Sequence, residues 1–492
     1  MRFPMRSGSD SQGSRLRVKT YSMPYNNGGI MVDLLIKNAL VVTCHPNVIS
    51  GKMYSPGAIA VQGDRILEIG PSAELEEKYS DAKKVIDGAG RIVMPGFIIT
   101  HTHMPYVLGH NQPVDVSQLR SFWDMLQKMG WEWLEDITTT DGILAATQYA
   151  SLKMLKSGTT TVCDLVEAPN ALPGPLNASV RAITQTGIRA QIGYEVTERV
   201  PGVPIAERLD PSYAERGFEE NVRLLESLAS AAGQNSRIQG RLGVHTAYTN
   251  SPATLRRARE IADQFKCGIQ IHIAEIPRAF LLEKYGKSAP EVLEETGLLG
   301  PDVVAAHCID LTDTDIDILA RNKVNVAHTP MTNSLGGNGV ARVPEMMEKG
   351  INISLGHDCF FTLDTAEYIR YAYLIHKAHW ANPALLPPFQ ALDLALGNAA
   401  AALGMEREIG SLDVGKKADI ILIRPDSPMP IVPSTVIAFF TMTFRGSDVE
   451  TVIVDGEIVV DGGTSTRVDE AIVRKACVEQ AAALWKRNGI EV

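Results

Sequence analysis

Residues 95–103, Pro-Gly-Phe-Ile-Ile-Thr-His-Thr-His, are typical of a short apolar strand that ends in two histidines. Side chains two positions apart lie on the same face of a strand, so His101 and His103 would leave its end side by side. Two neighbouring imidazoles can bind one metal ion. Histidines close to a Pro-Gly turn can equally be incidental, so the choice between the two interpretations depends on the residues downstream.

From residue 95 to residue 404, short apolar strands alternate with longer helical stretches. The predicted strands after 96–100 are 159–165, 189–194, 238–244, 268–273, 303–307, 324–328 and 351–357, and the predicted helices are 140–157, 177–186, 218–232, 252–265, 289–295, 312–323, 344–349 and 365–379. Eight strand–helix units over about 300 residues predict a parallel (β/α)8 TIM-type barrel of the α/β class. An open doubly wound sheet is the alternative, but no Gly-x-Gly-x-x-Gly motif follows the first strand.

The segments on either side of the barrel have β character. Residues 31–94 and 405–465 contain short apolar strands and hairpin signals such as Gly-Asp and Asp-Gly. Each segment is too small for a core of its own, so we expect them to form one composite β-sandwich domain. Residues 466–492 are expected to form a C-terminal helix. Residues 1–30 are polar, basic and rich in Gly and Ser, which predicts a disordered leader.

The composition excludes several classes of partner. The 492 residues are 45% hydrophobic and 21% charged, and the net charge of −10 argues against nucleic acid and anionic membranes. No apolar run approaches the ~18–20 residues of a membrane span. The six cysteines are scattered and form no CxxC pair, so we expect a reducing cytoplasm and no disulfide framework.

Polar side chains gather at the predicted C-terminal ends of the barrel strands, where barrels of this kind build their active sites. Seven of the eleven histidines are in this position: His101, His103, His245, His272, His307, His328 and His357. Glu275 lies three residues after His272, and Asp358 follows the last strand. Any one of them could be an ordinary core or surface residue, but their shared position predicts a functional site.

Four short motifs contain these residues: Pro95-Gly96 before His101-Thr102-His103, His272-x-x-Glu275, Ala306-His307-Cys308, and Leu355-Gly356-His357-Asp358. Together they resemble the amidohydrolase superfamily and, within it, the cytosine deaminase-like branch. That branch includes guanine, S-adenosylhomocysteine and methylthioadenosine deaminases and the s-triazine chlorohydrolases. The resemblance spans about residues 33–465, and residues 409–419 resemble the start of the family's C-terminal β segment.

The resemblance implies a metal site. His101, His103, His272 and Asp358 would bind one divalent ion, Zn²⁺ or alternatively Fe²⁺, and leave a position open for water. Binuclear members of the superfamily usually bridge two metals with a lysine or glutamate at the end of strand four. Residues 241–245 contain no such lysine, which favours a single ion.

The resemblance also implies catalytic roles. Glu275 would take a proton from the attacking water and pass it to the leaving side of the substrate, although a surface or helix-start carboxylate is the simpler interpretation. Asp358 would share the proton chemistry, and His307 would orient the water and stabilise the oxyanion.

Two further residues are expected to contact the substrate. His245 is the first. Its alternative role is to support neighbouring side chains of the site. Trp123 is the second; it lies in a long insertion, about 104–138, which we expect to be a lid or a substrate wall. For Trp131 and Trp133 in the same insertion we favour simple packing.

The expected activity is hydrolytic deamination, with ammonia released from an amino-substituted purine, pterin, pyrimidine or triazine ring. The resemblance also implies a homodimer or higher homo-oligomer. Hydrolytic dechlorination, or hydrolysis of another C–N bond at the same site, is the alternative. Glu275 favours amine loss, because ammonia must be protonated to leave whereas chloride need not be. A non-catalytic scaffold on this fold would lack a metal ligand or Glu275, and neither is missing.

Overall fold

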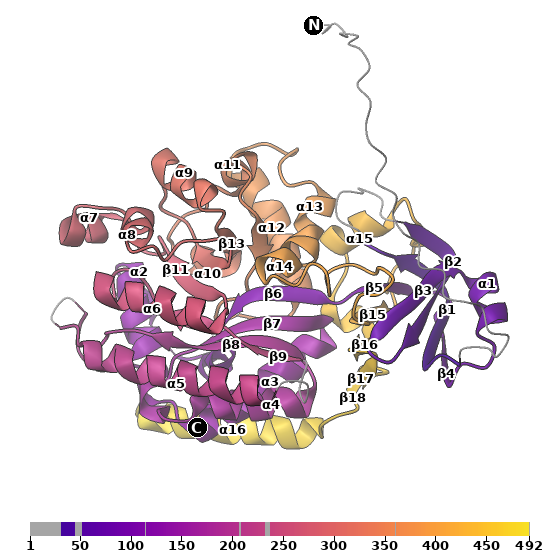
Figure 1. Ribbon diagram of the computed structural model, residues 1–492, viewed down its shortest axis with the longest axis horizontal. Helices are drawn as coiled ribbons and strands as arrows, with labels where there is room; N and C mark the ends of the chain where they lie inside the picture. The colour runs from indigo at the N-terminus through magenta and orange to yellow at the C-terminus, as the bar shows by residue number, and fades with distance from the viewer. Residues whose placement is uncertain are drawn as a thin grey trace, which may run out of the picture.

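The computed structural model describes residues 31–44, 52–113, 115–205, 208–231, 237–359 and 361–491, and the leader predicted at 1–30 lies outside these ranges. The described chain forms a barrel with a smaller sheet domain beside it (Figure 1). In this part of the chain, no helix combines the length and hydropathy needed to span a bilayer.

The barrel wall consists of parallel strands in sequence order. They are β6 (Phe97–Thr102), β7 (Thr159–Val166), β8 (Arg189–Val196), β9 (Ile238–Gly240), β10 (Leu242–Val244), β11 (Ile269–Ile273), β12 (Val303–His307), β13 (Asn325–His328) and β14 (Ile353–Leu355). The fourth predicted strand is divided into β9 and β10, which both pair with β8, and β10 then pairs with β11. A parallel bridge between Thr102 and Asp358 brings the first and last strands together. The predicted (β/α)8 barrel is confirmed.

Helices surround these strands. Those that match predicted helices are α3 (Thr140–Lys156), α4 (Pro175–Thr186), α5 (Pro211–Ser230), α6 (Pro252–Phe265), α8 (Ala289–Glu295), α9 (Asp313–Arg321), α11 (Val343–Glu348) and α12 (Thr365–His379). Their starts have a local cause: Ser251 caps α6 and Asp364 caps α12 through side-chain oxygens that accept backbone N–H groups. The short helices α7 (Ala279–Tyr285), α10 (Pro330–Leu335), α13 (Pro388–Asp393) and α14 (Gly397–Ala402) were not predicted.

The long insertion after β6 folds over the barrel as short helical turns. It contains η1 (Met104–Gly109), η2 (Val116–Gln118), α2 (Phe122–Met125), η3 (Leu126–Trp131) and η4 (Glu135–Ile137). Aromatic and methionine side chains of α2 and η3 join the main hydrophobic core, which fixes the insertion against the barrel.

The N- and C-terminal segments combine into one small β domain beside the barrel, as the sequence predicted. Its strands are β1 (Leu34–Val42), β2 (Met53–Gln62), β3 (Arg65–Pro71), β4 (Lys84–Asp87), β5 (Ile92–Pro95), β15 (Ile420–Ile423), β16 (Val449–Val454), β17 (Glu457–Asp461) and β18 (Thr464–Ser465). The antiparallel pair β5–β15 joins the two segments, and hydrogen bonds connect all nine strands into a single sheet. An unpredicted helix, α1 (Ser72–Lys78), covers part of one face.

The C-terminal helix α16 (Glu470–Arg487) leaves the sheet domain and runs along the outside of the barrel (Figure 1). It packs against α3 and η1, so it contacts the insertion that follows the first barrel strand. Helix α15 (Val436–Met442) packs against α12 and α13.

Candidate active site

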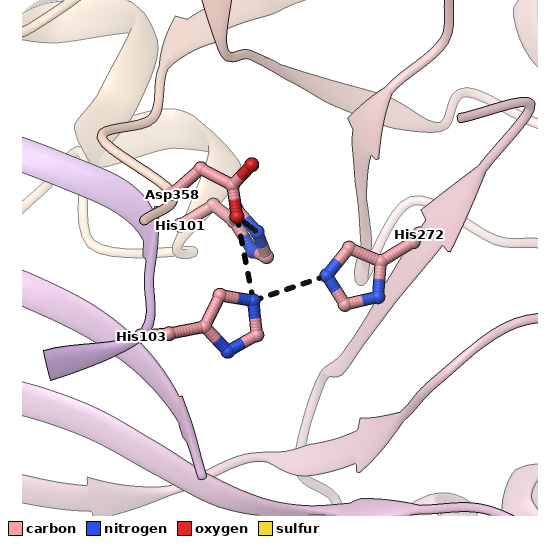
Figure 2. A group of neighbouring side chains, drawn as sticks. All are labelled: His101, His103, His272 and Asp358. Atoms are coloured by element: carbon pink, nitrogen blue, oxygen red, sulfur yellow. Dashed lines mark hydrogen bonds and ion pairs between the residues drawn. The ribbon is translucent and has the colours of Figure 1, made fainter. Parts of the chain in front are cut away.

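Four side chains from three places in the barrel converge on one point (Figure 2). His101 and His103 come from β6 and the residue after it, His272 from β11, and Asp358 from the segment after β14. One ligand atom from each lies within 4.8 Å of the others, and all four residues are buried. The structure therefore brings together the four predicted metal ligands.

Backbone hydrogen bonds where the first and last barrel strands meet place the ligands of these strands side by side. The N–H of His103 donates to the carbonyl oxygen of Asp358 at 3.0 Å, and the N–H of His357 donates to that of His101 at 2.9 Å. Asp358 has a φ of 62° and His307 a φ of 71°, left-handed conformations that are uncommon outside glycine. Such residues gather at functional sites, where the surrounding structure fixes them.

Hydrogen bonds to carbonyl oxygens set the tautomers of two ligands. Nδ1 of His103 lies 2.8 Å from the carbonyl oxygen of Leu165, and Nδ1 of His272 lies 3.0 Å from that of His245. Because a carbonyl oxygen only accepts, each Nδ1 carries the hydrogen and each Nε2 has a free lone pair. Burial lowers the pKa of His103 to about 3 and the pKa of His272 well below its ordinary value. Both imidazoles are therefore neutral, which is the form that binds metal.

The spacing of the ligand atoms fits one divalent ion. His103 Nε2 lies 3.2 Å from His272 Nε2 and 3.5 Å from Asp358 Oδ1, which is 3.3 Å from His101 Nε2. Zinc–nitrogen bonds of ~2.0–2.1 Å in a near-tetrahedral arrangement place neighbouring ligand atoms roughly 3.3 Å apart. The side-chain amide nitrogen of Gln270 lies 2.7 Å from His101 Nδ1 and so restrains the orientation of that ring.

Glu275 and His307 lie beside the ligand group. Glu275 follows β11 and is buried, and its Oε1 lies 3.5 Å from Nε2 of His307. Nε2 of His307 is also 3.8 Å from Oδ2 of Asp358. Nδ1 of His307 lies 3.0 Å from the amide oxygen of Asn333, so it carries the hydrogen and Nε2 is directed between the two carboxylates.

The two carboxylates differ in proton affinity. Burial raises the pKa of Glu275 to about 7; the imidazole of His307 opposes this shift and the carboxylate of Asp358 adds to it. Burial would also raise the pKa of Asp358, but His307 and His101 hold it well below its ordinary value. Asp358 therefore stays ionised, whereas Glu275 can exchange a proton near neutral pH. Such a pair suits general acid–base chemistry.

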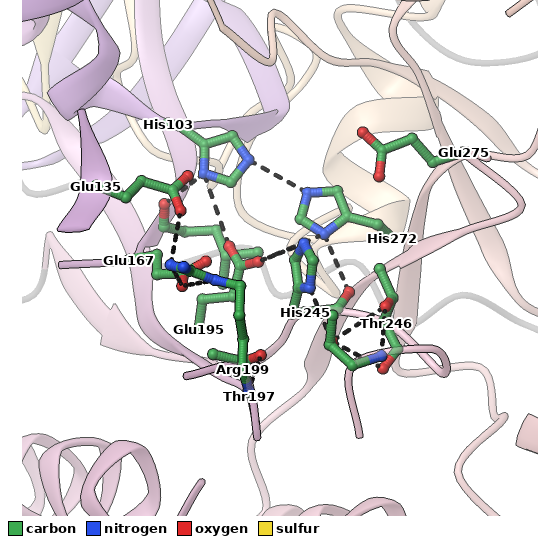
Figure 3. Close-up of polar contacts among 12 residues, drawn as sticks. His103, Glu135, Glu167, Glu195, Thr197, Arg199, His245, Thr246, His272 and Glu275 are labelled. Atoms are coloured by element: carbon green, nitrogen blue, oxygen red, sulfur yellow. Dashed lines mark hydrogen bonds and ion pairs between the residues drawn. The ribbon is translucent and has the colours of Figure 1, made fainter. Parts of the chain in front are cut away.

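His245 lies next to the ligand group together with a residue that was not predicted, Glu195. Glu195 is the next-to-last residue of β8, and its Oε1 is 3.4 Å from His245 Nε2 and 3.8 Å from His272 Nδ1 (Figure 3). These three residues form a second group with metal-ligating atoms. Nδ1 of His272 carries a hydrogen and donates to a carbonyl oxygen, so it cannot bind a metal. Glu195 and His245 are therefore better explained as polar side chains that support the four proposed metal ligands.

The ligand group opens onto an inner cavity and a larger vestibule. The inner cavity, of about 30 Å³, is lined by residues that include His103, Trp131, Glu135, Glu195, His245 and Glu275. The vestibule, of about 930 Å³, has mainly apolar walls that include Phe122, Trp123, Phe280, Ile309 and Leu335. Glu275, Phe122 and Met125 line both spaces and so lie between them.

The tryptophans of the insertion have different positions. Trp123 stands in the vestibule wall and stacks on Phe280 with ring centroids 5.2 Å apart. Trp131 packs as expected, but it also lines the inner cavity and its ring centroid is 5.6 Å from that of His245. Trp133 packs against Trp485 of α16, away from the ligand group.

The remaining histidines at strand ends are not in the ligand group. His328 lies 3.1 Å from His376 of α12, measured between their Nε2 atoms, and both are buried. His357 contacts the hydroxyl of Thr365 at 3.0 Å and stacks on Tyr368. These contacts give both strand-end histidines a packing role.

A buried cluster of charges borders the inner cavity on the side away from Glu275 (Figure 3). The Arg199 guanidinium pairs with Glu167 at 2.5 Å and with Asp136 at 2.7 Å, and Glu135 lies 3.6 Å away. Arg199 also lies over the ring of Trp131, 4.7 Å from its centroid. The cluster holds the insertion against β7 and β8.

Comparison with known proteins agrees with this geometry. A model of the amidohydrolase family matches residues 92–459. The chain belongs to the amidohydrolase family. A model of an imidazolonepropionase-like composite domain from bacteria matches residues 57–82, in the sheet domain.

Relatives of this amidohydrolase cover nearly the whole chain. A 5'-deoxyadenosine deaminase from Methanosarcina acetivorans is 34% identical over 445 residues, which are 89% of this chain and 95% of the relative. A 5-methylthioadenosine/S-adenosylhomocysteine deaminase from Syntrophomonas wolfei is 32% identical, over 88% of this chain and 96% of the relative. An adenosine deaminase structure from Xanthomonas campestris with bound zinc matches with a TM-score of 0.79 at 22% identity, over 92% of this chain and 99% of that chain, and supports the fold. The predicted family, and the predicted hydrolytic enzyme acting on C–N bonds other than peptide bonds, are confirmed.

Proposed function

We propose that this amidohydrolase removes the amino group of an adenine nucleoside by hydrolysis and releases ammonia. The observation that carries the proposal is the position of Glu275, a buried carboxylate with a pKa of about 7 beside the metal-ligand group. Amine loss needs a group that first accepts a proton and then donates it, and Glu275 is placed to do both. The deaminase relatives favour adenine nucleosides over the other rings that carry an amino group.

We assign the four ligands His101, His103, His272 and Asp358 to one divalent ion, Zn²⁺ or alternatively Fe²⁺. Such an ion lowers the pKa of a water molecule from 15.7 to about 7 and so supplies the nucleophile at neutral pH.

The residues around the ion then move the protons. The carboxylate of Glu275 accepts a proton from the attacking water and delivers it to the ring nitrogen next to the reacting carbon. His307 holds the attacking oxygen through Nε2, and Asp358 takes the second proton. The C–O bond forms first. Glu275 then receives the second proton from Asp358 and donates it to the amine, so that the C–N bond breaks and ammonia leaves.

We expect the 5' side of the nucleoside to lie in the vestibule. Its walls near Trp123, Phe280 and Leu335 are apolar, which suits a 5' substituent that is absent, small or apolar. We therefore expect 5'-deoxyadenosine and methylthioadenosine to be better substrates than nucleotides. Trp123 and His245 are the residues that we expect to contact the bound substrate. We also keep the expectation of a homodimer or higher homo-oligomer.

The test is ammonia release by the purified, zinc-loaded protein from adenosine, 5'-deoxyadenosine and methylthioadenosine, with guanine, cytosine and a pterin as competing amino heterocycles. Atrazine, assayed for chloride release, tests the dechlorination alternative at the same site. We expect ammonia from at least one adenine nucleoside, with the highest kcat/KM of the panel. Protein that binds zinc but releases no ammonia from any adenine nucleoside would contradict the proposal.

A further inference from the structure

Tyr248 is a buried tyrosine to which neither the metal site nor the proton chemistry assigns a role. It lies shortly after β10, is 2% exposed, and lines neither the inner cavity nor the vestibule. Its hydroxyl donates to Oε2 of Glu275 at 3.5 Å. Contacts of this length are common at catalytic groups before the substrate binds, and they shorten in the complex. Within the described chain, no other side chain donates a hydrogen bond to the Glu275 carboxylate.

The position of the Tyr248 hydroxyl is set by the wall behind the site. The ring packs between Trp123 and Phe280, with centroid distances of 5.6 Å and 6.0 Å. The backbone is held as well: Nζ of Lys284 donates to the carbonyl oxygen of Tyr248 at 2.9 Å, and the N–H of Tyr248 donates to the hydroxyl of Thr246 at 3.2 Å. These contacts fix the hydroxyl without any help from the carboxylate that it meets.

The two oxygens of Glu275 therefore have different surroundings. Oε2 faces the hydroxyl of Tyr248, whereas Oε1 lies 3.5 Å from Nε2 of His307, on the side of the metal-ligand group. A phenol hydroxyl has one hydrogen to donate, and Oε2 can accept it whether the carboxyl group is ionised or protonated on the other oxygen. A proton on Oε2 would instead displace this hydrogen bond. Oε1 is thus the oxygen that is free to exchange a proton.

A carboxylate that moves protons benefits from such an anchor. The last torsion of a glutamate side chain has a broad distribution, so a free carboxylate turns easily about it. A hydrogen bond to one oxygen restrains this rotation and keeps the other oxygen directed at the reacting atoms. Small errors in this direction are costly, because a displacement of about 1 Å can lower the rate by about 10²-fold.

We propose that Tyr248 is a positioning residue for Glu275: its hydroxyl holds Oε2, so that Oε1 alone accepts and returns the proton. The assignment rests on the proposed deaminase activity. Because Tyr248 lines neither space, it acts through Glu275 and not through contact with the substrate.

The first test is the activity of Tyr248→Phe, which keeps the packed ring and removes only the hydroxyl. We expect kcat/KM for 5'-deoxyadenosine to fall by about 10- to 100-fold, with zinc content unchanged. Tyr79→Phe is the matched control. The hydroxyl of Tyr79 also donates to a carboxylate, that of Glu68 at 2.6 Å, but this pair lies in the sheet domain, so both activity and zinc content should stay at the wild-type level.

The second test is the pH profile of the same proteins, which simple loss of packing would not move. Burial raises the pKa of Glu275, and the hydroxyl of Tyr248 opposes this rise. Without the hydroxyl, the ionised form loses a donor, so the acid limb of kcat/KM should move to higher pH by about 0.5 to 1 pH unit. The other titratable groups that face Glu275 are the same in both proteins: His307, Asp358, Glu195 and Cys359.

Three results would overturn the assignment. Wild-type kcat/KM in Tyr248→Phe would mean that the hydroxyl is dispensable. A loss of activity with an unmoved acid limb would mean that Tyr248 only packs, and a loss in proportion to lost zinc would mean that it supports the metal site. Failure of the proposed function is distinguishable, because the wild type itself would then release no ammonia from 5'-deoxyadenosine or the other adenine nucleosides.

Discussion

The carboxylate of Glu275 and the imidazole of His307 face each other beside the metal-ligand group, with Oε1 and Nε2 3.5 Å apart. They come from neighbouring strands, β11 and β12, whose parallel pairing places Ile273 opposite His307. This register brings Glu275, which we propose for proton transfer, and His307, which we propose to hold the attacking oxygen, to the same edge of the site.

Substitution of Glu275 by glutamine should abolish turnover without removing the metal. The amide keeps the shape of the side chain but cannot accept and return a proton, so we expect kcat to fall by about 10²- to 10⁴-fold. Steady-state ammonia release measures the fall in kcat, and zinc content shows whether the metal site is intact. Glu283→Gln, on the exposed face of α7, is the control and should behave like the wild type. Equal turnover by Glu275→Gln and the wild type would remove Glu275 from the mechanism.

The acidity of Glu275 predicts the pH dependence of the enzyme. Burial raises the pKa of Glu275 to about 7 in the absence of an ion, and a bound cation favours the ionised form and lowers this pKa. The group must be ionised to accept a proton, so kcat/KM should fall as the pH drops below the pKa. We expect an acid limb with a midpoint between about pH 5 and about pH 7. A profile that stays flat from about pH 5 to pH 8 would be inconsistent with Glu275 as the proton acceptor.

Gln270 should affect metal affinity although it does not bind the metal. Its amide lies 2.7 Å from Nδ1 of His101 and fixes that ring. Gln270→Leu keeps the volume and removes the contact, so we expect metal affinity to fall by about 10- to 100-fold. Competition with a chelator measures the affinity, and Gln185→Leu on the exposed surface of α4 serves as the control. Unchanged affinity would mean that packing alone orients His101.

The barrel and the convergence of the four proposed metal ligands could be predicted because they leave local signals in the sequence. Apolar strands at regular spacing predict the wall, and His101, His103 and His272 stand where those strands end. Glu195 was missed although it also lies near the C-terminal end of a strand. It has no short-range spacing to His245 or His272 and meets them only through the pairing of β8, β10 and β11. A search for carboxylates as well as histidines at strand ends would have indicated Glu195.

Other features depend on contacts between distant segments, which a single sequence does not encode locally. The stacking of His357 on Tyr368 and the pairing of His328 with His376 follow from where α12 docks. The position of α16 is a further case. Its helical character was predicted, but its contact with the insertion after β6 depends on the path of the chain around the barrel.

Helix α16 holds that insertion from outside. The indole Nε1 of Trp485 donates to the carbonyl oxygen of Leu108 at 3.1 Å, and the amide of Asn488 donates to that of Trp133 at 2.8 Å. The insertion also carries Trp123, in the vestibule wall. The C-terminal helix is therefore connected to the substrate site although none of its residues lines either space.

Trp485→Ala should accordingly weaken substrate binding more than chemistry. Loss of the indole removes both the hydrogen bond to Leu108 and the packing against Trp133, so the insertion becomes more mobile. We expect KM to rise by about 3- to 10-fold with kcat and zinc content nearly unchanged, since the proposed ligands and Glu275 lie on barrel strands or shortly after them, outside the insertion. Trp380→Ala, at the end of α12, removes a tryptophan that contacts His376 and His379 and should leave KM unchanged. A fall in kcat at constant KM would instead place α16 in support of the catalytic groups themselves.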